Sequence, residues 1–382
     1  MIIQTKKKRL FSLKNKGKTF ILLAIMGLSC VSASKGISES IAEESIKGKD
    51  LLAMGRSRVT SKGLELITSG SYFSFEFSGK DFQLKVALPN WVERSYIQYE
   101  IDGVYQQRVK IEKGGATLSL SASTDGKHIV TIYKATEAQS GGVFIEEVIA
   151  KNAKPVAVAK GPLIEFIGDS ITCGAASDVT DVPCGKGAYT DYHNAYLAYG
   201  PRVARALKAN FIVSGASGKG VYRNWNNDGP GVPVLYRTKS MMPNDKDEWD
   251  FKTFRPNIIS IALGTNDLSD GDKKTERLPF DKEKFVTEYI KFIDALKEAN
   301  PDAKIVLLNS PTVNGAKKQL LEEAMLAIKT AVDQKYSKAK PVTLLYFTAI
   351  KPKGCNGHPN TEDHEQMANE ITAQFKNILN QK

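Results

Sequence analysis

The sequence predicts an α/β domain with a five-stranded parallel sheet, preceded by an all-β sandwich domain. Two patterns support this fold class. Residues 51–150 alternate between polar and apolar with period two, as half-buried strands do. After residue 162, short apolar runs alternate with helical patterns, which is typical of parallel strands buried on both faces. The proline- and glycine-containing stretch at residues 152–162 is the expected linker.

The sandwich is expected over residues 45–152. Phe73, Phe75 and Phe77 share one face of a strand, and Asp102-Gly103 and Asp125-Gly126 give hairpin turn signals. No convincing helical pattern interrupts this region, so short antiparallel strands are expected throughout.

The second domain is expected over residues 160–382. Its predicted strands are Ile164–Ile167, Phe211–Val213, Ile258–Leu263, Ile305–Leu308 and Leu344–Phe347. Its predicted helices are Pro201–Lys208, Phe285–Glu298, Leu320–Tyr336 and a closing helix with Met367, Ile371, Phe375 and Ile378 on one face.

Residues 1–33 resemble a secretory signal peptide. Seven basic residues and no acidic one accompany a short apolar run at residues 20–28, and Val31-Ser32-Ala33 fits a cleavage site. We expect a secreted or periplasmic protein. The alternative is a lipobox at Gly27–Cys30, which would attach the chain to the cell surface through a lipid on Cys30. Without these seven charges the net charge of +11 falls to +4, so nucleic acid is not an expected partner.

Three cysteines remain after such cleavage: Cys173, Cys184 and Cys355. In an oxidising compartment one pair and one free thiol are expected. The bridge could join Cys173 to Cys355, or Cys184 to either of them, and three buried free thiols are the alternative. No CxxC spacing or histidine cluster indicates a metal site.

A serine and a histidine follow two of the predicted strands. Ser170 follows the apolar run Leu163–Gly168 after one aspartate, Asp169. His358 comes after the last predicted strand, directly before Pro359. The carboxyl ends of parallel strands meet at one edge of a sheet, so we expect the two side chains to meet there, as nucleophile and base. His128, His193 and His364 compete less well: His128 lies within a strand pattern, His193 in a polar loop, and His364 on the expected exposed first turn of the last helix.

Two further strand ends supply donors for an oxyanion. Gly218 can expose a backbone N–H, and Asn266 can present a side-chain amide. Asp169 and Asp267 are expected to be turn or helix-cap residues. Tyr222 and Trp225 follow Gly218 closely and are candidates for stacking on a sugar ring, with Trp91 and Trp249 as further candidates. For Trp225, packing in the core is the alternative.

The ordered blocks Gly168-Asp169-Ser170, Gly218, Gly264-Thr265-Asn266-Asp267 and His358-Pro359 resemble those of the SGNH hydrolases. The resemblance implies a flavodoxin-like three-layer fold. It also implies Ser170 as nucleophile, His358 as base, and an oxyanion hole formed by Ser170, Gly218 and Asn266.

The motifs Gly168–Gly174, Ser217–Asn224 and Gly354–Pro359 resemble more closely the family 2 carbohydrate esterases. Ser69–Phe73 and His128–Ala138 resemble that family's N-terminal jelly-roll domain. The resemblance implies a carbohydrate O-acetylesterase that uses an acyl-enzyme and needs no metal or organic cofactor. The implied partner is an acetylated polysaccharide or oligosaccharide of plant type, such as xylan or glucomannan.

One departure concerns the aspartate that most SGNH enzymes carry two or three residues before the histidine. Asn356 and Cys355 stand there instead. We therefore predict a Ser170–His358 dyad, in which a backbone carbonyl or the Asn356 side chain orients the imidazole. Two other functions are weighed: an SGNH esterase or lipase acting on lipid or short acyl esters, and a glycan-binding protein without catalysis.

Overall fold

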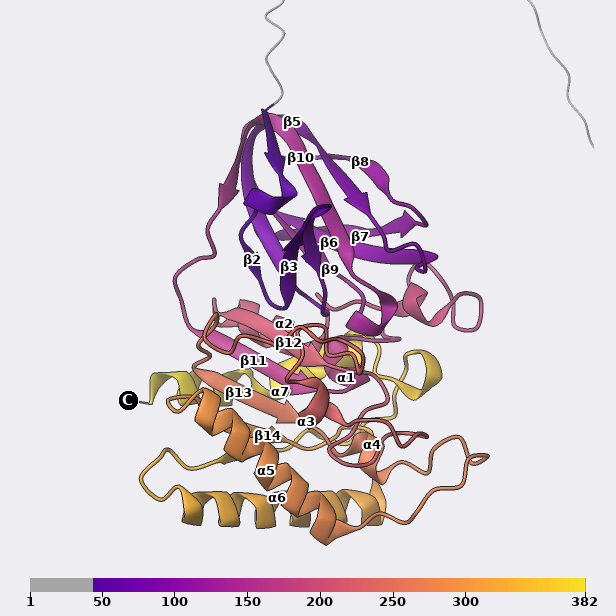
Figure 1. Cartoon of the computed structure of the whole chain (residues 1–382), viewed down its shortest axis with the longest axis vertical. Coiled ribbons are helices and arrows are strands. Elements are labelled where there is room, and N and C mark those ends of the chain that lie inside the picture. Colours follow the sequence, from indigo (N-terminus) through magenta and orange to yellow (C-terminus); the bar gives the residue numbers. More distant parts are fainter. Residues whose placement is uncertain (1–43, 382) are drawn as a thin grey trace, which may run out of the picture. The chain divides into compact units, whose positions relative to one another are not determined.

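Two β-sheets organise residues 44–381, the part of the chain that this computed structural model describes (Figure 1). The expected signal peptide and Cys30 lie outside the described residues. Among residues 44–381, no helix is both long and apolar enough to cross a membrane.

The first sheet is antiparallel and has ten strands. They are β1 (Glu44–Lys47), β2 (Ala53–Met54), β3 (Ser57–Thr60), β4 (Gly63–Leu66), β5 (Tyr72–Ala87), β6 (Arg94–Ile101), β7 (Val104–Glu112), β8 (Ala116–Ser121), β9 (Lys127–Lys134) and β10 (Val143–Val156).

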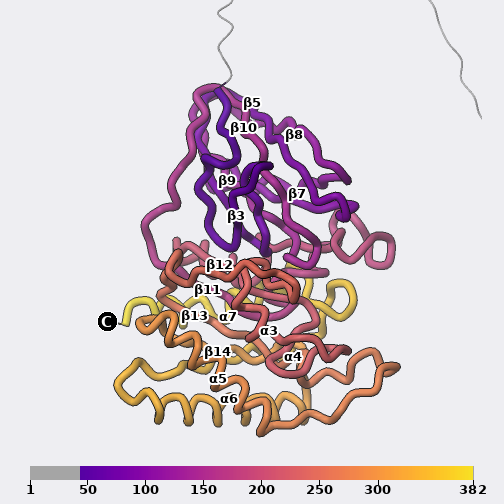
Figure 2. Tube along the Cα trace, viewed as in Figure 1, coloured from indigo at the N-terminus to yellow at the C-terminus, as the bar shows by residue number. Residues whose placement is uncertain are grey.

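The two longest strands, β5 and β10, run through this curled sheet (Figure 2). Its buried apolar side chains form a single core. The first half of β5 pairs with β9 and its second half with β8, and Gly79, with φ 104°, lies between the halves. A glycine can take this backbone conformation at low cost, so the strand can change partners there. Phe73, Phe75 and Phe77 are buried in the core, as their alternation predicted.

β10 extends four residues beyond the expected domain end at residue 152. After register shifts between Ala150 and Lys154, it pairs again with β5 through Lys154–Val156. Pro155, one of the residues that indicated a linker, lies within this part of β10 and is paired with Phe75. Only residues 157–162 connect the two sheets outside regular structure.

The second sheet is parallel, with the strand order β12-β11-β13-β14-β15. Its strands are β11 (Leu163–Gly168), β12 (Asn210–Gly215), β13 (Ile258–Ala262), β14 (Lys304–Leu308) and β15 (Thr343–Leu345). All five predicted strands are present. The last ends at Leu345 rather than Phe347, because the side chain of Asn309 bonds the Phe347 backbone in place of a neighbouring strand.

Helices cover both faces of this sheet, as expected. The helices are α1 (Ser170–Cys173), α2 (Tyr199–Ala206), α3 (Val232–Leu235), α4 (Thr265–Leu268), α5 (Lys282–Ala299), α6 (Gly315–Lys335) and α7 (Thr361–Asn380). The apolar residues of α5 and α6 share one core with Ile259, Ile261 and Ile305 of the sheet. Those of α2 and α7 share another core with Ile164, Phe166 and Val306.

A buried charge cluster joins the two sheets. Arg56, between β2 and β3, is fully buried and donates to Ser214 Oγ (3.1 Å) and to the carbonyls of Tyr236 and Thr238. Its guanidinium also lies 4.6 Å from the Trp249 ring centre. Ser214 Oγ donates in turn to Glu165, in the centre of β11. A glutamate in this otherwise apolar strand is thus explained by an arginine from the other sheet.

Candidate active site

Ser170 stands at the sharp turn from β11 into α1. Asp169 caps the helix, since its Oδ1 accepts a hydrogen bond from the Ile171 N–H at 3.0 Å. Gly168 is required at the strand end, because a Cβ there would lie 2.1 Å from Thr172 Oγ1. The turn leaves Ser170 8% exposed, at the edge where β11 ends.

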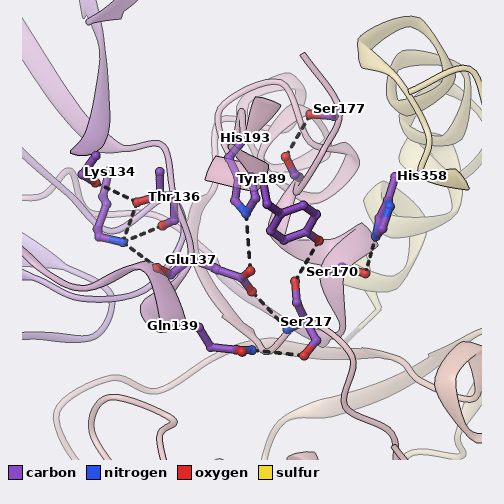
Figure 3. Close-up of polar contacts among 12 residues, drawn as sticks. Lys134, Thr136, Glu137, Gln139, Ser170, Ser177, Tyr189, His193, Ser217 and His358 are labelled. Carbon is purple, nitrogen blue, oxygen red and sulfur yellow. Dashed lines mark hydrogen bonds and ion pairs between the residues drawn. The ribbon is translucent and has the colours of Figure 1, made fainter. Parts of the chain in front are cut away.

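His358 reaches Ser170 from the far end of the chain. Its Nε2 lies 2.8 Å from Ser170 Oγ (Figure 3). Its Nδ1 lies 3.1 Å from both the Cys355 and the Asn356 carbonyl oxygens. Carbonyls only accept hydrogen bonds, so Nδ1 carries the proton. In the neutral ring, Nε2 is therefore free to accept the serine proton.

Backbone carbonyls thus take the position of the absent aspartate. Of the two acceptors expected for Nδ1, the structure uses the backbone and not the Asn356 side chain. Asn356 (φ 54°) and Gly357 (φ 74°) both adopt left-handed conformations, which turn the chain so that the carbonyls of residues 355 and 356 face Nδ1. Asparagine and glycine are the residues that tolerate this conformation best.

A disulfide anchors the turn that carries His358. Of the pairings that the sequence left open, the structure forms Cys184–Cys355 and leaves Cys173 as a buried thiol. The Cys355 N–H also donates to the Ala176 carbonyl at 2.9 Å. Two independent links therefore tie the histidine turn to the loop that follows Ser170.

Asn266 holds the segments of Ser170 and Gly218 together. Its Nδ2 lies 2.8 Å from the Lys219 carbonyl and 3.4 Å from Asp169 Oδ2. The second contact is longer than a good hydrogen bond, so this N–H is only loosely held. Within residues 44–381, the backbone N–H groups of Ser170 and Gly218 donate to no other residue. The structure therefore brings all four predicted residues into one region, and their catalytic roles stay predictions.

Burial shapes the charges around this site. It raises the pKa of both Asp169 and Asp267 to about 6, although backbone N–H donors oppose the shift. Asp267 accepts from three consecutive backbone N–H groups, those of Val221, Tyr222 and Arg223, and so holds the loop after Gly218. Burial also lowers the pKa of His358 below its usual value, with the two backbone carbonyls opposing.

The candidate aromatic residues differ in their surroundings. Trp225 is 43% exposed, and its backbone N–H donates to the Gly218 carbonyl, so the residue lies beside the expected oxyanion loop. The Tyr222 hydroxyl accepts from the Asp281 N–H and its ring packs near Phe280, which gives it a packing role. Trp249 is buried beside Arg56. Trp91 is exposed on the first domain. Sugar binding by any of them stays a prediction.

Three residues near the site were not predicted to belong to it: Tyr189 and Glu137 were not considered, and His193 was set aside as a base because it lies in a polar loop. The Tyr189 ring centre lies 6.1 Å from that of His358 and 4.6 Å from that of His193. His193 pairs with the buried Glu137 of the first domain, their Nε2 and Oε1 atoms 3.3 Å apart. Tyr189 and His193 lie in no periodic pattern or motif, and Glu137 lies in the His128–Ala138 stretch, which indicated only the type of domain, so the sequence carried no clear signal for a site role.

The structure contradicts the expectation that His364 is exposed. We expected it on an exposed helical turn, but it is fully buried, with Nδ1 accepting from the Tyr199 N–H. Its burial lowers its pKa to about 3.

In the described part of the chain, no group of three or more His, Cys, Asp or Glu side chains is arranged to hold a metal ion. That catalysis needs no metal or cofactor stays a prediction.

Comparisons with known proteins agree on one group of relatives. Residues 166–376 match the GDSL-like Lipase/Acylhydrolase family, and residues 53–158 match the carbohydrate esterase 2 N-terminal family. An acetylxylan esterase / glucomannan deacetylase of Cellvibrio japonicus is 30% identical over 78% of this chain and 81% of its own length.

Solved structures give the same picture. A family two carbohydrate esterase from Clostridium thermocellum in complex with cellohexaose has a TM-score of 0.76 and 26% identity. The match covers 88% of this chain and 99% of that one. A family two carbohydrate esterase from Cellvibrio japonicus has a TM-score of 0.75 and 25% identity, with 88% and 98% covered.

The surroundings of His358 and His128 shift their pKa values in opposite directions. His358 should titrate below about 6.5, the ordinary histidine value, because burial disfavours its charged form. His128, bonded to Asp102, should titrate above it. NMR of the imidazole carbon-bound protons between pH 4 and 9, with assignment by single His→Gln variants, measures both. A midpoint for His358 above that of His128 would contradict the geometry.

The disulfide predicts a redox-dependent stability. Replacing both Cys184 and Cys355 by alanine should lower the free energy of unfolding by about 2–5 kcal/mol, since the cross-link closes a loop of 171 residues. Urea denaturation measures this change. Dithiothreitol should destabilise the wild type similarly and leave the double variant unaffected. An unchanged wild-type midpoint under dithiothreitol would argue against the bridge.

Proposed function

Because the chain belongs to the family 2 carbohydrate esterases, with a GDSL-like lipase/acylhydrolase domain, we propose that it removes O-acetyl groups from plant-type polysaccharides such as xylan and glucomannan. The family makes the chain a carboxylic-ester hydrolase. The observation that carries the proposal of a serine esterase mechanism is the 2.8 Å contact between Ser170 Oγ and His358 Nε2.

The proposed reaction proceeds through an acetyl-enzyme. His358 Nε2 takes the proton as Ser170 Oγ attacks the acetyl carbonyl. The imidazolium so formed donates through Nδ1 to the two backbone carbonyls. It then gives the proton to the departing sugar oxygen. Water, activated by the same Nε2, finally releases acetate and restores Ser170.

The oxyanion of each tetrahedral intermediate needs preorganised donors. The Ser170 and Gly218 N–H groups, which donate to no described residue, are the proposed backbone donors. The loosely held second N–H of Asn266 is the third. A dyad held by carbonyls keeps the correct tautomer, so the large penalty seen when a triad aspartate becomes asparagine, about 10⁴-fold, need not apply here.

The substrate class rests on the relatives and on the character of the loops. The loops near Ser170 and Gly218 are rich in Asp, Asn, Gly and Tyr residues, whereas a lipid or long-acyl substrate would need an apolar acyl groove. This composition favours a small acetyl group on a carbohydrate over a lipid ester. The relative solved with cellohexaose supports a β-linked glycan lying across the site, with the exposed Trp225 ring as a stacking surface.

Export is part of the same proposal. Residues 1–33 resemble a signal peptide, and the Cys184–Cys355 disulfide favours an oxidising compartment. Either secretion or a lipid anchor on Cys30 would bring the enzyme to extracellular polysaccharides.

Replacing Ser170 by alanine tests the nucleophile. Acetate release from acetylated xylan and glucomannan should fall at least about 10³-fold, because the acyl-enzyme can no longer form. Ser177→Ala is the matched control, since Ser177 Oγ only donates to the Gly174 carbonyl and activity should persist. Acetate release by wild type that survives in Ser170→Ala would refute the mechanism. Faster hydrolysis of p-nitrophenyl octanoate than of the acetate would favour a lipid or longer-acyl substrate. A wild type that binds glycan but releases no acetate would be a binding protein.

Trp225→Ala tests the stacking surface. The KM for acetylated xylan should rise about fivefold, because a ring face for the sugar is lost. The KM for p-nitrophenyl acetate should not change, since that substrate does not extend over the ring. Trp225→Phe keeps an aromatic face and should restore most of the affinity. Equal effects of Trp225→Ala on both substrates would point to packing instead.

A further inference from the structure

Two side chains of the first domain hold Ser217, the residue before Gly218. They belong to the segment just after β9. Figure 3 shows both reaching Ser217. Glu137 Oε2 accepts from the Ser217 N–H at 3.0 Å, and Gln139 Nε2 donates to the Ser217 carbonyl at 3.1 Å. Both polar groups of the Ser217 backbone are thus bound from outside the α/β domain.

The bond from Gln139 bears directly on the Gly218 N–H. The Ser217 carbonyl and the Gly218 N–H belong to one peptide group, which is planar and, in the described chain, trans. In such a group the two point in opposite directions. A donor that fixes the carbonyl therefore fixes the direction of the N–H. Gly218 (φ 72°) has no side chain to restrict rotation of this peptide.

Glu137 is itself held rigidly. It is 2% exposed, and its other oxygen, Oε1, pairs with His193. Burial alone would raise its pKa, but His193 and Ser217 outweigh burial and lower it, so the carboxylate stays ionised. Lys134 Nζ donates to the backbone carbonyls of Thr136 and Glu137 at 2.7 and 2.9 Å and so holds the backbone of this segment.

Tyr189 adds a third contact to the same residue. Its hydroxyl lies 3.4 Å from Ser217 Oγ, while its ring contacts those of His193 and His358. These contacts therefore connect Glu137 and Gln139 of the first domain, through Ser217 and Tyr189, to the ring of His358.

We propose that Gln139 and Glu137 are positioning residues for catalysis: they clamp the Ser217–Gly218 peptide so that the Gly218 N–H faces the oxyanion. The first domain would then complete the active site, beyond any part it plays in stability or glycan binding. This inference rests on the proposed function in one respect, the use of Gly218 as an oxyanion donor.

Gln139→Met tests the clamp. Methionine has a similar length and no charge, and residue 139 is exposed, so the fold should persist. The kcat for p-nitrophenyl acetate should fall about tenfold, because a donor is misdirected rather than removed. KM should stay within about twofold and the pH midpoint should not move, since neither ground-state binding nor His358 is altered. Affinity for phenylboronic acid, which forms a tetrahedral adduct with serine, should fall with kcat.

Gln106→Met is the matched control. Gln106 is also an exposed glutamine of the first domain whose Nε2 donates to a backbone carbonyl, that of Val104, at 2.9 Å. Its kinetics should equal those of the wild type. Glu137→Gln provides a second variant: it keeps an acceptor for the Ser217 N–H and should lose only severalfold in kcat, whereas Glu137→Leu should lose more.

The possible outcomes test the clamp hypothesis and the proposed substrate class separately. An unchanged kcat in Gln139→Met, or a loss confined to thermal stability or KM, would overturn the clamp. A wild type that hydrolyses p-nitrophenyl acetate but no acetylated polysaccharide would refute the substrate class, while the same p-nitrophenyl acetate kinetics still decide the clamp. A wild type that hydrolyses neither would refute both.

Discussion

The parallel pairing of β11 with a neighbour on each side is the constraint on which the site depends. Gly168, its last residue, pairs with Gly215 of β12 on one side and Ala262 of β13 on the other. The three strands therefore end level, and the residues that follow them must share one edge of the sheet. Asn266 then joins the three segments through its contacts with Asp169 and Lys219.

The base reaches this edge by a different route. His358 lies in an irregular turn, where no strand fixes its position. Left-handed conformations at Asn356 and Gly357, the disulfide at Cys355 and the bond to Ala176 fix it instead. Two neutral backbone carbonyls orient the ring, in the place where the resemblance to the SGNH hydrolases led us to look for an aspartate. They oppose the fall in the His358 pKa less than a full negative charge would, and burial prevails.

The first domain is bound to the second by interactions that are costly to break. Arg56 is buried among the side chains and carbonyls of the second domain, and removing one partner from a buried charged cluster leaves the other without compensation. Glu137 and Gln139 lie at this junction between the domains and contact the loop of Gly218. This arrangement gives a physical reason for the two domains to occur together.

The sequence by itself determined the fold class, the parallel strands and the place of Ser170 at their shared edge, because strand periodicity and sheet topology are local or topological properties. It predicted that His358 would meet Ser170 there, but a turn, a disulfide and a backbone bond set by tertiary packing bring the ring to 2.8 Å from Ser170 Oγ. It did not determine the end of β10, the burial of His364, the partner of Glu165 or the choice of Cys184 for Cys355. Nor did it indicate Glu137, Gln139, His193 and Tyr189. These features depend on distances between elements far apart in the chain, and only tertiary packing sets those distances.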